Sequence, residues 1–161
     1  MTLDAEQLRA AMRAWTSGVT IVTAAYGGEQ HGMTVSSFTS ISLEPPLIVI
    51  SLHTATHTHR LVSLAGAFGV TILSSKQQAL SERFAGRISQ NGNRLDGVET
   101  ETLVSGAPFL KGGLAYLDCR VTQTITSGMN TLFIAEVIAA HGYDHKEALI
   151  YHDRKYHNLE D

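Results

Sequence analysis

The sequence predicts a mainly β domain, an antiparallel barrel to which two or three short helices are added. Residues 117–126 alternate between apolar and polar side chains, which is typical of a strand with one buried face. Gly128 interrupts this run, and residues 131–140 then predict a second long strand and a hairpin. A third observation is the run of Leu, Ile and Val over 47–52, after Pro45-Pro46, which predicts a buried strand.

In the first half of the chain, Asp4 and Gln7 form a capping box that predicts a first helix. Its apolar face continues through Leu8, Met12 and Trp15, and we expect the helix to end at Ser17-Gly18. Residues 19–24 predict a strand, and Gly27-Gly28 a hairpin turn. The next strand begins near residue 31 and carries a cluster of small hydroxyl residues: Thr34, Ser36, Ser37, Thr39 and Ser40.

The middle of the chain predicts two further helices. A polar segment over 53–59 leads into helical residues 60–64, and residues 67–73 predict a strand. Ser75 and Gln78 form a second capping box, which opens a helix that ends near Phe84. Residues 85–100 predict a loop because Gly and Asn interrupt them repeatedly.

The last part of the chain predicts β structure. The apolar residues of 131–140 do not alternate cleanly, so we expect both faces of that strand to be buried. A short strand over 149–151 and a tail to Asp161 end the sequence. With no linker or repeat, residues 1–161 predict a single domain.

Composition narrows the function classes. Hydrophobic residues make up 43% of the chain and charged residues 17%, so we expect another subunit to cover part of the surface. Net charge is −3 without a basic stripe, which argues against nucleic acid as a partner. Cys119 is the single cysteine, which excludes a disulfide framework and predicts a small buried residue. We expect no signal peptide, no membrane span and a cytoplasmic location.

The candidate chemistry begins with histidine, since the chain has eight. His53, His57 and His59 lie close in sequence, as do His141 and His145, but none has a strong metal-ligand spacing. We therefore expect solvent-facing side chains and no metal. A nucleophile elbow of the Gly-x-Ser-x-Gly type and a Gly-x-Gly-x-x-Gly dinucleotide fingerprint are both absent from the sequence.

Three groups of hydroxyl residues suggest an anion site. They are Thr34 to Ser37, the threonines 54, 56 and 58 before a helix, and Ser81 ahead of Phe84-Ala85. Hydroxyls and free N–H groups at a helix start can bind a phosphate without lysine. Each group alone is more typical of capping and turn formation, but the three together, with the apolar strand 47–52 between them, leave both interpretations open.

From about residue 13 to 159, the sequence resembles the short-chain flavin reductase family, the split-barrel FMN-binding proteins. The matching segments occur in order: Trp15 to Thr23, Gly32 to Ser40 with Pro45-Pro46, Thr58, Gly66 to Val70, Leu80 to Ala85, Gly113 to Cys119 and Thr131 to Val137. The resemblance implies a split β-barrel and a homodimer with flavin near the subunit interface.

The resemblance also implies the residues that hold the flavin. Thr34, Val35, Ser36 and Ser37 would line the isoalloxazine ring and ribityl chain. Ser51, Leu52 and His53 would continue that wall, largely through backbone groups. The phosphate would be held by Thr56, Thr58, Ser81, Phe84 and Ala85.

Two departures from the family pattern fall on the side of the reductant. Gly128-Met129-Asn130 replaces the family's usual Gly-Asp-His, and Arg154 stands where a glycine is usual. Asn130 can form hydrogen bonds but cannot titrate. Candidates for the nicotinamide pocket are Asn130, His152 and Tyr156.

The resemblance implies an NAD(P)H-dependent flavin reductase that passes hydride to FMN or FAD and supplies reduced flavin to a partner monooxygenase. An alternative is a flavin carrier or sensor that does not turn over NADH or NADPH, which the two departures favour. A third is a histidine-based metal or haem site on the same barrel. The sequence chooses neither between FMN and FAD nor between NADH and NADPH.

Overall fold

The computed structural model describes residues 2–87, 92–144 and 147–159. The helices are α1 (Ala5–Met12), α2 (His57–Ala65) and α3 (Gln78–Phe84), and the short 3₁₀ helix η1 (Ser75–Gln77) precedes α3. The strands are β1 (Ser17–Gly18), β2 (Thr20–Tyr26), β3 (Glu29–Val35), β4 (Phe38–Leu43), β5 (Pro46–His53), β6 (Ala67–Ile72), β7 (Thr100–Glu101), β8 (Phe109–Leu110), β9 (Ala115–Ser127), β10 (Asn130–Gly142), β11 (Leu149–His152) and β12 (Lys155–Asn158).

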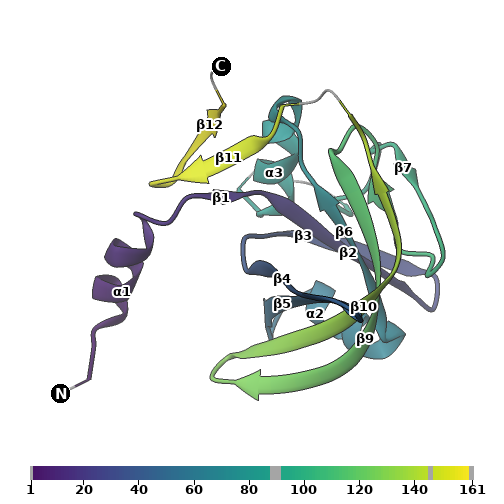
Figure 1. The fold of residues 1–161 in the computed structure, drawn as a ribbon, viewed down its shortest axis with the longest axis horizontal. Coiled ribbons are helices and arrows are strands. Elements are labelled where there is room, and N and C mark those ends of the chain that lie inside the picture. Colours follow the sequence, from purple (N-terminus) through teal and green to yellow (C-terminus); the bar gives the residue numbers. More distant parts are fainter. Residues whose placement is uncertain (1, 88–91, 145–146, 160–161) are drawn as a thin grey trace.

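The molecule is mainly β with short helices, and its main sheet forms a split barrel (Figure 1). Seven antiparallel strands follow the order β3-β2-β6-β9-β10-β5-β4, and the sheet curves around a core. The edge strands β3 and β4 are not paired with each other, although only Ser36 and Ser37 separate them in sequence. The hydroxyl cluster therefore lies at the opening of the barrel.

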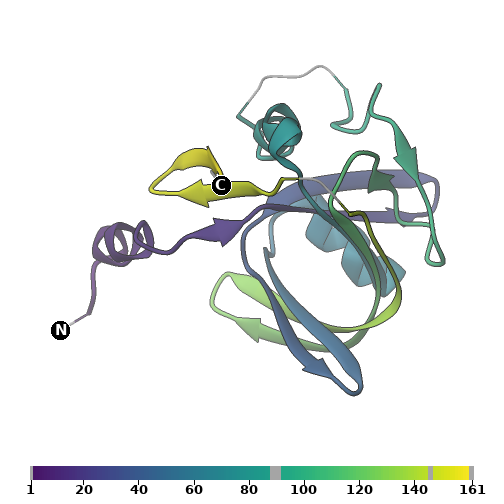
Figure 2. The same ribbon diagram turned by 45° about the horizontal axis from the view of Figure 1, so that its top comes forward.

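The main core fills the curved sheet and is closed by α2 (Figure 2). Leu61 and Val62 of α2 are fully buried against strand residues such as Val22, Ile50 and Phe133. Gly66 ends α2 with a φ of 63°, a left-handed conformation that glycine adopts without steric cost. The N-terminus of α2 lies beside β3, where the hydroxyl of Thr58 contacts His31.

A second, smaller sheet with the order β1-β11-β12 lies outside the barrel. A second core, with Ile21, Leu73, Phe84 and Leu149, packs between this sheet, α3 and the start of β2. The β11–β12 hairpin and α1 project beside the barrel in both views (Figures 1 and 2). This arrangement places β11 and β12, the last two strands, beside β1.

The start of α1 and the ends of α2 and α3 were predicted to within one residue, whereas the end of α1 and the start of α2 were not. The capping box at Asp4 and Gln7 is present, but α1 ends at Met12 and its apolar face is exposed. It stops early because Ser17 and Gly18 pair with Tyr151 and Ile150 of β11 instead of ending a helix.

The other two helix starts are displaced. The second box uses Ser74, whose N–H donates to Gln77 Oε1 at 3.0 Å, one residue earlier than predicted. Helix α2 begins at His57, three residues before the predicted start at Arg60, because the hydroxyl of Thr56 caps it by accepting the N–H of His59.

The strands show four corrections. The predicted strand after Gly28 is broken at Ser36-Ser37 into β3 and β4, and β12 was not predicted. The expected burial of both faces of β10 is wrong, because its side chains alternate between half-buried and buried up to Ala135. In β9, Asp118 is fully buried while Ile125 is 41% exposed, against the predicted alternation.

Cys119 is buried as predicted, and burial raises the pKa of its thiol to about 12. Over the described residues, the helices are too short and too polar for any of them to cross a membrane.

Candidate functional site

Three cavities lie in a row along the opening of the barrel. The first, the α2 cavity, has a volume of about 420 Å³ and lies between α2, β3 and the end of α3. The central cavity, about 280 Å³, shares Thr34 and Ala85 with it. The outer cavity, about 650 Å³, shares Ser36 and Tyr151 with the central one. Together they form one groove that a long, flat molecule could occupy.

Donor groups dominate the α2 cavity. It is lined by His31, Met33, Thr34, Thr56, His57, Thr58, Phe84, Ala85 and Arg94, so among these described residues none is acidic. In the first turn of α2 the N–H of His59 donates to the capping hydroxyl of Thr56, which leaves the N–H groups of His57 and Thr58 without an intrahelical acceptor and available to a ligand. The helix dipole also favours an anion at this end.

Two side chains of this cavity are held in place by protein contacts. Arg94 donates to the carbonyl oxygens of Gly32 and Phe84 at 3.1 and 3.0 Å. The Thr58 hydroxyl, which is fully buried, lies 2.8 Å from Nδ1 of His31. The guanidinium and the imidazole are therefore fixed beside the cavity before any ligand arrives.

The electrostatics of the α2 cavity favour a negative ligand. The His31 ring stacks on His57, with centroids 4.6 Å apart. Burial, followed by the charges of Arg94 and His57, lowers the pKa of His31 to about 4. On the outer side, Glu29 contacts His57 and Arg60 at about 3 Å, and these hydrogen bonds lower the pKa of its carboxyl.

The central cavity is lined by hydroxyl groups from three parts of the chain. Thr34 of β3 donates to the carbonyl of Ser81 at 2.6 Å. The Ser81 hydroxyl, fully buried, lies 2.8 Å from the phenol oxygen of Tyr156 on β12. Arg87 donates to the hydroxyl of Tyr151 at 2.9 Å and lies over that ring. These contacts tie the β11–β12 hairpin to α3 along the groove.

The predicted flavin residues divide into two sets. Thr34, Thr56, Thr58, Phe84 and Ala85 line the α2 cavity, Ser36 and Ser81 line the central one, and Ser37 lines the outer one. The side chains of Val35 and Leu52 instead belong to the main core. Only the backbone of those two residues can reach the groove.

A second hydrogen-bond network joins the split edge to the β9–β10 hairpin. Ser37 donates to the carbonyl of Ser51 at 2.8 Å, and Asn130 donates to the Ser51 hydroxyl at 2.9 Å. The ring of His53 accepts the N–H of Ala55 at 3.1 Å. The network fixes the wall of β5 that faces the opening.

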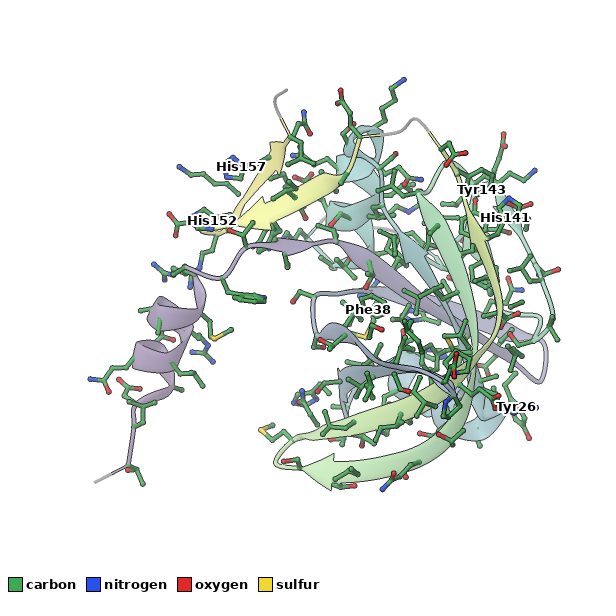
Figure 3. The ribbon with its side chains drawn as sticks, in the orientation of Figure 1. Tyr26, Phe38, His141, Tyr143, His152 and His157 are labelled. Atoms are coloured by element: carbon green, nitrogen blue, oxygen red, sulfur yellow. The ribbon has the colours of Figure 1, made fainter. Side chains whose placement is uncertain are left out.

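The three residues predicted for a nicotinamide pocket do not form one cluster within a single chain. Asn130 lies at the tip of the β9–β10 hairpin, whereas His152 is on β11 and contacts Thr16 at 2.8 Å (Figure 3). Tyr156 lines the central cavity through its contact with Ser81. The structure thus brings Tyr156 to the groove and leaves Asn130 and His152 outside the three cavities.

Sequence reasoning missed His31, His57 and Arg94. We expected histidines to face solvent; His57 does so on one side, but His59 is half-buried against Thr131 and Phe133. No sequence signal pairs residue 31 with residue 58, because strand pairing and helix packing create that contact. His145 lies outside the described residues, and within the described ranges no group of three or more His, Cys, Asp or Glu side chains could hold a metal ion.

Comparison with known proteins gives a consistent match. The family described as "Flavin reductase like domain" matches residues 12–160. The chain is 37% identical over 137 residues to "FMN reductase (NADH) SmoA" of Agrobacterium fabrum, which covers 85% of this chain and 76% of that protein. It is 33% identical over 153 residues to "FADH(2)-dependent resorcinol hydroxylase, reductase component" of Rhizobium sp., covering 94% and 85%.

A solved structure shows the same fold. The flavin reductase PheA2 in its native state superposes with a TM-score of 0.91 at 33% sequence identity. The match covers 99% of this chain and all of that one. The similarity therefore includes the β11–β12 hairpin and α1 as well as the barrel.

Proposed function

This chain belongs to the flavin reductase-like family, and we propose that it is an NADH-dependent flavin reductase acting on FMN or FAD. The reduced flavin serves a separate monooxygenase component, as the names of its relatives support. The structural observation that carries the proposal is the donor-lined, carboxylate-free α2 cavity, which opens into a groove at the split of the barrel.

The phosphate of the flavin occupies the α2 cavity in this proposal. Thr56, Thr58 and the first-turn N–H groups of α2 would hold it, and Arg94 would supply the charge. Ser81, Phe84 and Ala85 close the other side of the groove. The lining fits a phosphate group by its charge, since its polar side chains are Thr, His and Arg and none is a carboxylate. The hydroxyls of Thr34 and Thr56 already donate to the carbonyls of Ser81 and His53, so Arg94 and the free N–H groups of α2 are the main donors to the phosphate.

The isoalloxazine ring and ribityl chain follow the groove towards the split. Thr34, Ser36 and Ser37 present hydroxyl and backbone groups there. Val35, Leu52 and the backbone of Ser51 and His53 support the wall from the core side. When bound, the flavin supplies a ring that accepts hydride from the nicotinamide, so the protein needs to bind, orient and exclude water.

No side-chain acid or base is required for this hydride transfer. The network of Ser37, Ser51 and Asn130 holds β5 and the β9–β10 hairpin in one position. We propose that Asn130, His152 and Tyr156 orient the nicotinamide, with Tyr156 acting from within the same chain. Asn130, at the far hairpin tip, would act on the groove of a second subunit.

We propose a homodimer, and the exposed apolar residues of the chain support it. Leu8 of α1, Leu43 of β4 and Met129 of the β9–β10 hairpin are 53%, 85% and 68% exposed. In both views α1 and the hairpin tip project to the same side of the molecule (Figures 1 and 2). A second copy on this side would cover these residues. We also propose that residues 1–161 form a single domain and that the protein acts in the cytoplasm.

The alternative function is a flavin carrier or sensor without NADH turnover. The observation that favours it is the Met129-Asn130 pair, since Asn130 is bonded to Ser51 and cannot carry a charge. The test is anaerobic mixing of protein, FMN and NADH while the absorbance of oxidised flavin is followed. Catalytic bleaching supports the reductase. Binding without bleaching by NADH or NADPH supports the carrier.

A further inference from the structure

The outer cavity has an arginine pair that the flavin proposal does not use. Arg13 follows the end of α1, and Arg154 lies in the turn between β11 and β12; both line the cavity. Neither arginine forms an ion pair with any described residue. The Nε of Arg13 is buried and has no hydrogen-bond partner within the described part of the chain. A buried, unsatisfied donor beside a cavity indicates a missing acceptor.

Arg154 holds an unfavourable backbone conformation. Asp153 and Arg154 form the two-residue loop of the β11–β12 hairpin, with φ values of 47° and 61°. Such a turn favours glycine at its second position, because a side chain with positive φ is strained. This chain nevertheless places a long cationic side chain there. A strained non-glycine residue that faces a cavity is most simply explained by a ligand contact.

The charge of the outer cavity opposes the charge of the whole chain. The chain carries a net charge of −3. In the outer cavity, Arg9, Arg13 and Arg154 are basic, and Asp153 is the single acidic side chain among its described lining residues. Arg9 is paired with Glu6 on α1, which leaves Arg13 and Arg154 to act on a ligand. The cavity therefore attracts an anion that the rest of the surface repels.

The position of the cavity identifies the anion. Hydride transfer needs the nicotinamide to lie against the flavin ring at van der Waals distance. The α2 cavity is at the far end of the groove, while the outer cavity contains Ser36 and Ser37, which the proposal places beside the ring. A reductant that approaches from the outer cavity would leave its phosphates close to α1 and the β11–β12 turn.

We propose that Arg13 and Arg154 bind the phosphate groups of the nicotinamide nucleotide in the outer cavity. This inference rests on the proposed reductase function. It gives Arg154 a binding role at a turn position whose positive φ favours glycine. The two arginines are binding residues and take no part in the hydride transfer.

The test uses Arg13→Gln and Arg154→Gly, with Lys155→Gln as the matched control. Lys155 neighbours Arg154, is exposed and does not line the outer cavity. Arg154→Gly removes the side chain while it relieves the turn, so loss of folding is not expected. Binding of ADP-ribose, which has the diphosphate but no nicotinamide, is measured by calorimetry alongside the KM for NADH at saturating FMN. Light scattering reports the oligomeric state of each variant.

Loss of one charged hydrogen-bond partner should weaken ADP-ribose binding and raise the KM for NADH by about tenfold or more, with kcat and FMN affinity unchanged. Lys155→Gln should change neither by more than about twofold. Unchanged ADP-ribose affinity and KM in both arginine variants overturn the inference. A change in oligomeric state without a change in nucleotide affinity also overturns it, because the cavity then belongs to the subunit interface. Failure of this inference can be distinguished from failure of the proposed reductase function, because in the latter case the wild-type protein itself would not oxidise NADH.

Discussion

Replacement of His31 by Asn tests whether an anion occupies the α2 cavity. His31 is half-buried there, and burial together with the nearby charges of Arg94 and His57 lowers its pKa to about 4. At neutral pH the ring is therefore uncharged in the free protein. A phosphate beside it would stabilise the protonated form, so FMN binding and proton uptake are coupled, and each strengthens the other. Asparagine keeps a hydrogen-bonding group next to Thr58 and removes the titration.

The magnitude follows from Coulomb's law. At about 4 Å and an effective dielectric constant of about 20, two unit charges interact by about 4 kcal/mol, which half-exposure reduces to about 2 kcal/mol. That is about 30-fold in affinity when His31 is fully protonated. The pKa of His31 in the free protein is about 4, so the ring is only partly protonated at pH 5. Only part of the roughly 30-fold gain in affinity therefore develops between pH 7 and pH 5. We expect wild type to gain about fourfold over His31→Asn between pH 7 and pH 5.

The assay is fluorescence titration of FMN at each pH, expressed as the ratio of wild-type to variant affinity. The ionisation of the FMN phosphate itself, near pH 6, affects both proteins and cancels in the ratio. Riboflavin has no phosphate and should give a flat ratio. His59→Asn is a matched control, since His59 is half-buried but does not line the α2 cavity. A flat ratio for FMN from pH 7 to pH 5 would refute the reasoning.

Other predictions concern single contacts. Thr58→Val should weaken FMN binding by about tenfold, because His31 loses its hydrogen-bond partner and the phosphate loses a donor. Fluorescence titration of FMN measures the affinity, and an unchanged affinity would remove Thr58 from the site. Arg154→Gly should raise the melting temperature by about 2–4 °C as the positive-φ strain is relieved, whereas an unchanged value in calorimetry argues against strain. Asp118→Ala should lower the free energy of unfolding by about 2–3 kcal/mol in a urea titration, because its buried carboxylate accepts the N–H groups of Val104 and Ser105; a loss below about 0.5 kcal/mol contradicts this.

The pH dependence of stability follows from the same histidine. Its folded-state pKa, about 4, lies below the ordinary value of 6.5, so the unfolded chain binds more protons between these values. The stability of the flavin-free protein is thus complete above about pH 6.5 and decreases as the pH falls towards 4. His31→Asn should lessen this decrease in urea titrations across the same range.

Local patterns were sufficient for most elements of the barrel. The strand β9, the glycine turn before β10 and the apolar run of β5 can each be recognised from a few neighbouring residues, although the burial within β9 departs from the predicted alternation. The capping box of α1 and the hairpin at Gly27-Gly28 were predicted for the same reason. The two-residue strand β1 and the β12 strand have no such signal, because their pairing with β11 defines them.

The candidate site was predicted in part. The hydroxyl groups of Thr34, Ser36 and Thr56 were identified as separate clusters, and the structure places them along one groove. The sequence could not show which residues from distant parts of the chain join these hydroxyl groups in the groove. Arg94 comes from a loop sixty-two residues after Gly32, to whose carbonyl it donates, and His31 meets Thr58 only because α2 packs on β3.

The main errors of the sequence reasoning coincide with the outer cavity. We predicted that α1 would continue to residue 17 and that the chain's last segment would be a simple tail. Both failed because Ser17 and Gly18 leave the helix to pair with β11, while β12 folds back on the same strand. This pairing places Arg13 and Arg154 on one cavity although they are far apart in the sequence. At this cavity long-range strand pairing overrides local propensity. The chain keeps the strained turn at Arg154 and the buried, unsatisfied Nε of Arg13 there, and a binding site is the simplest reason to keep both.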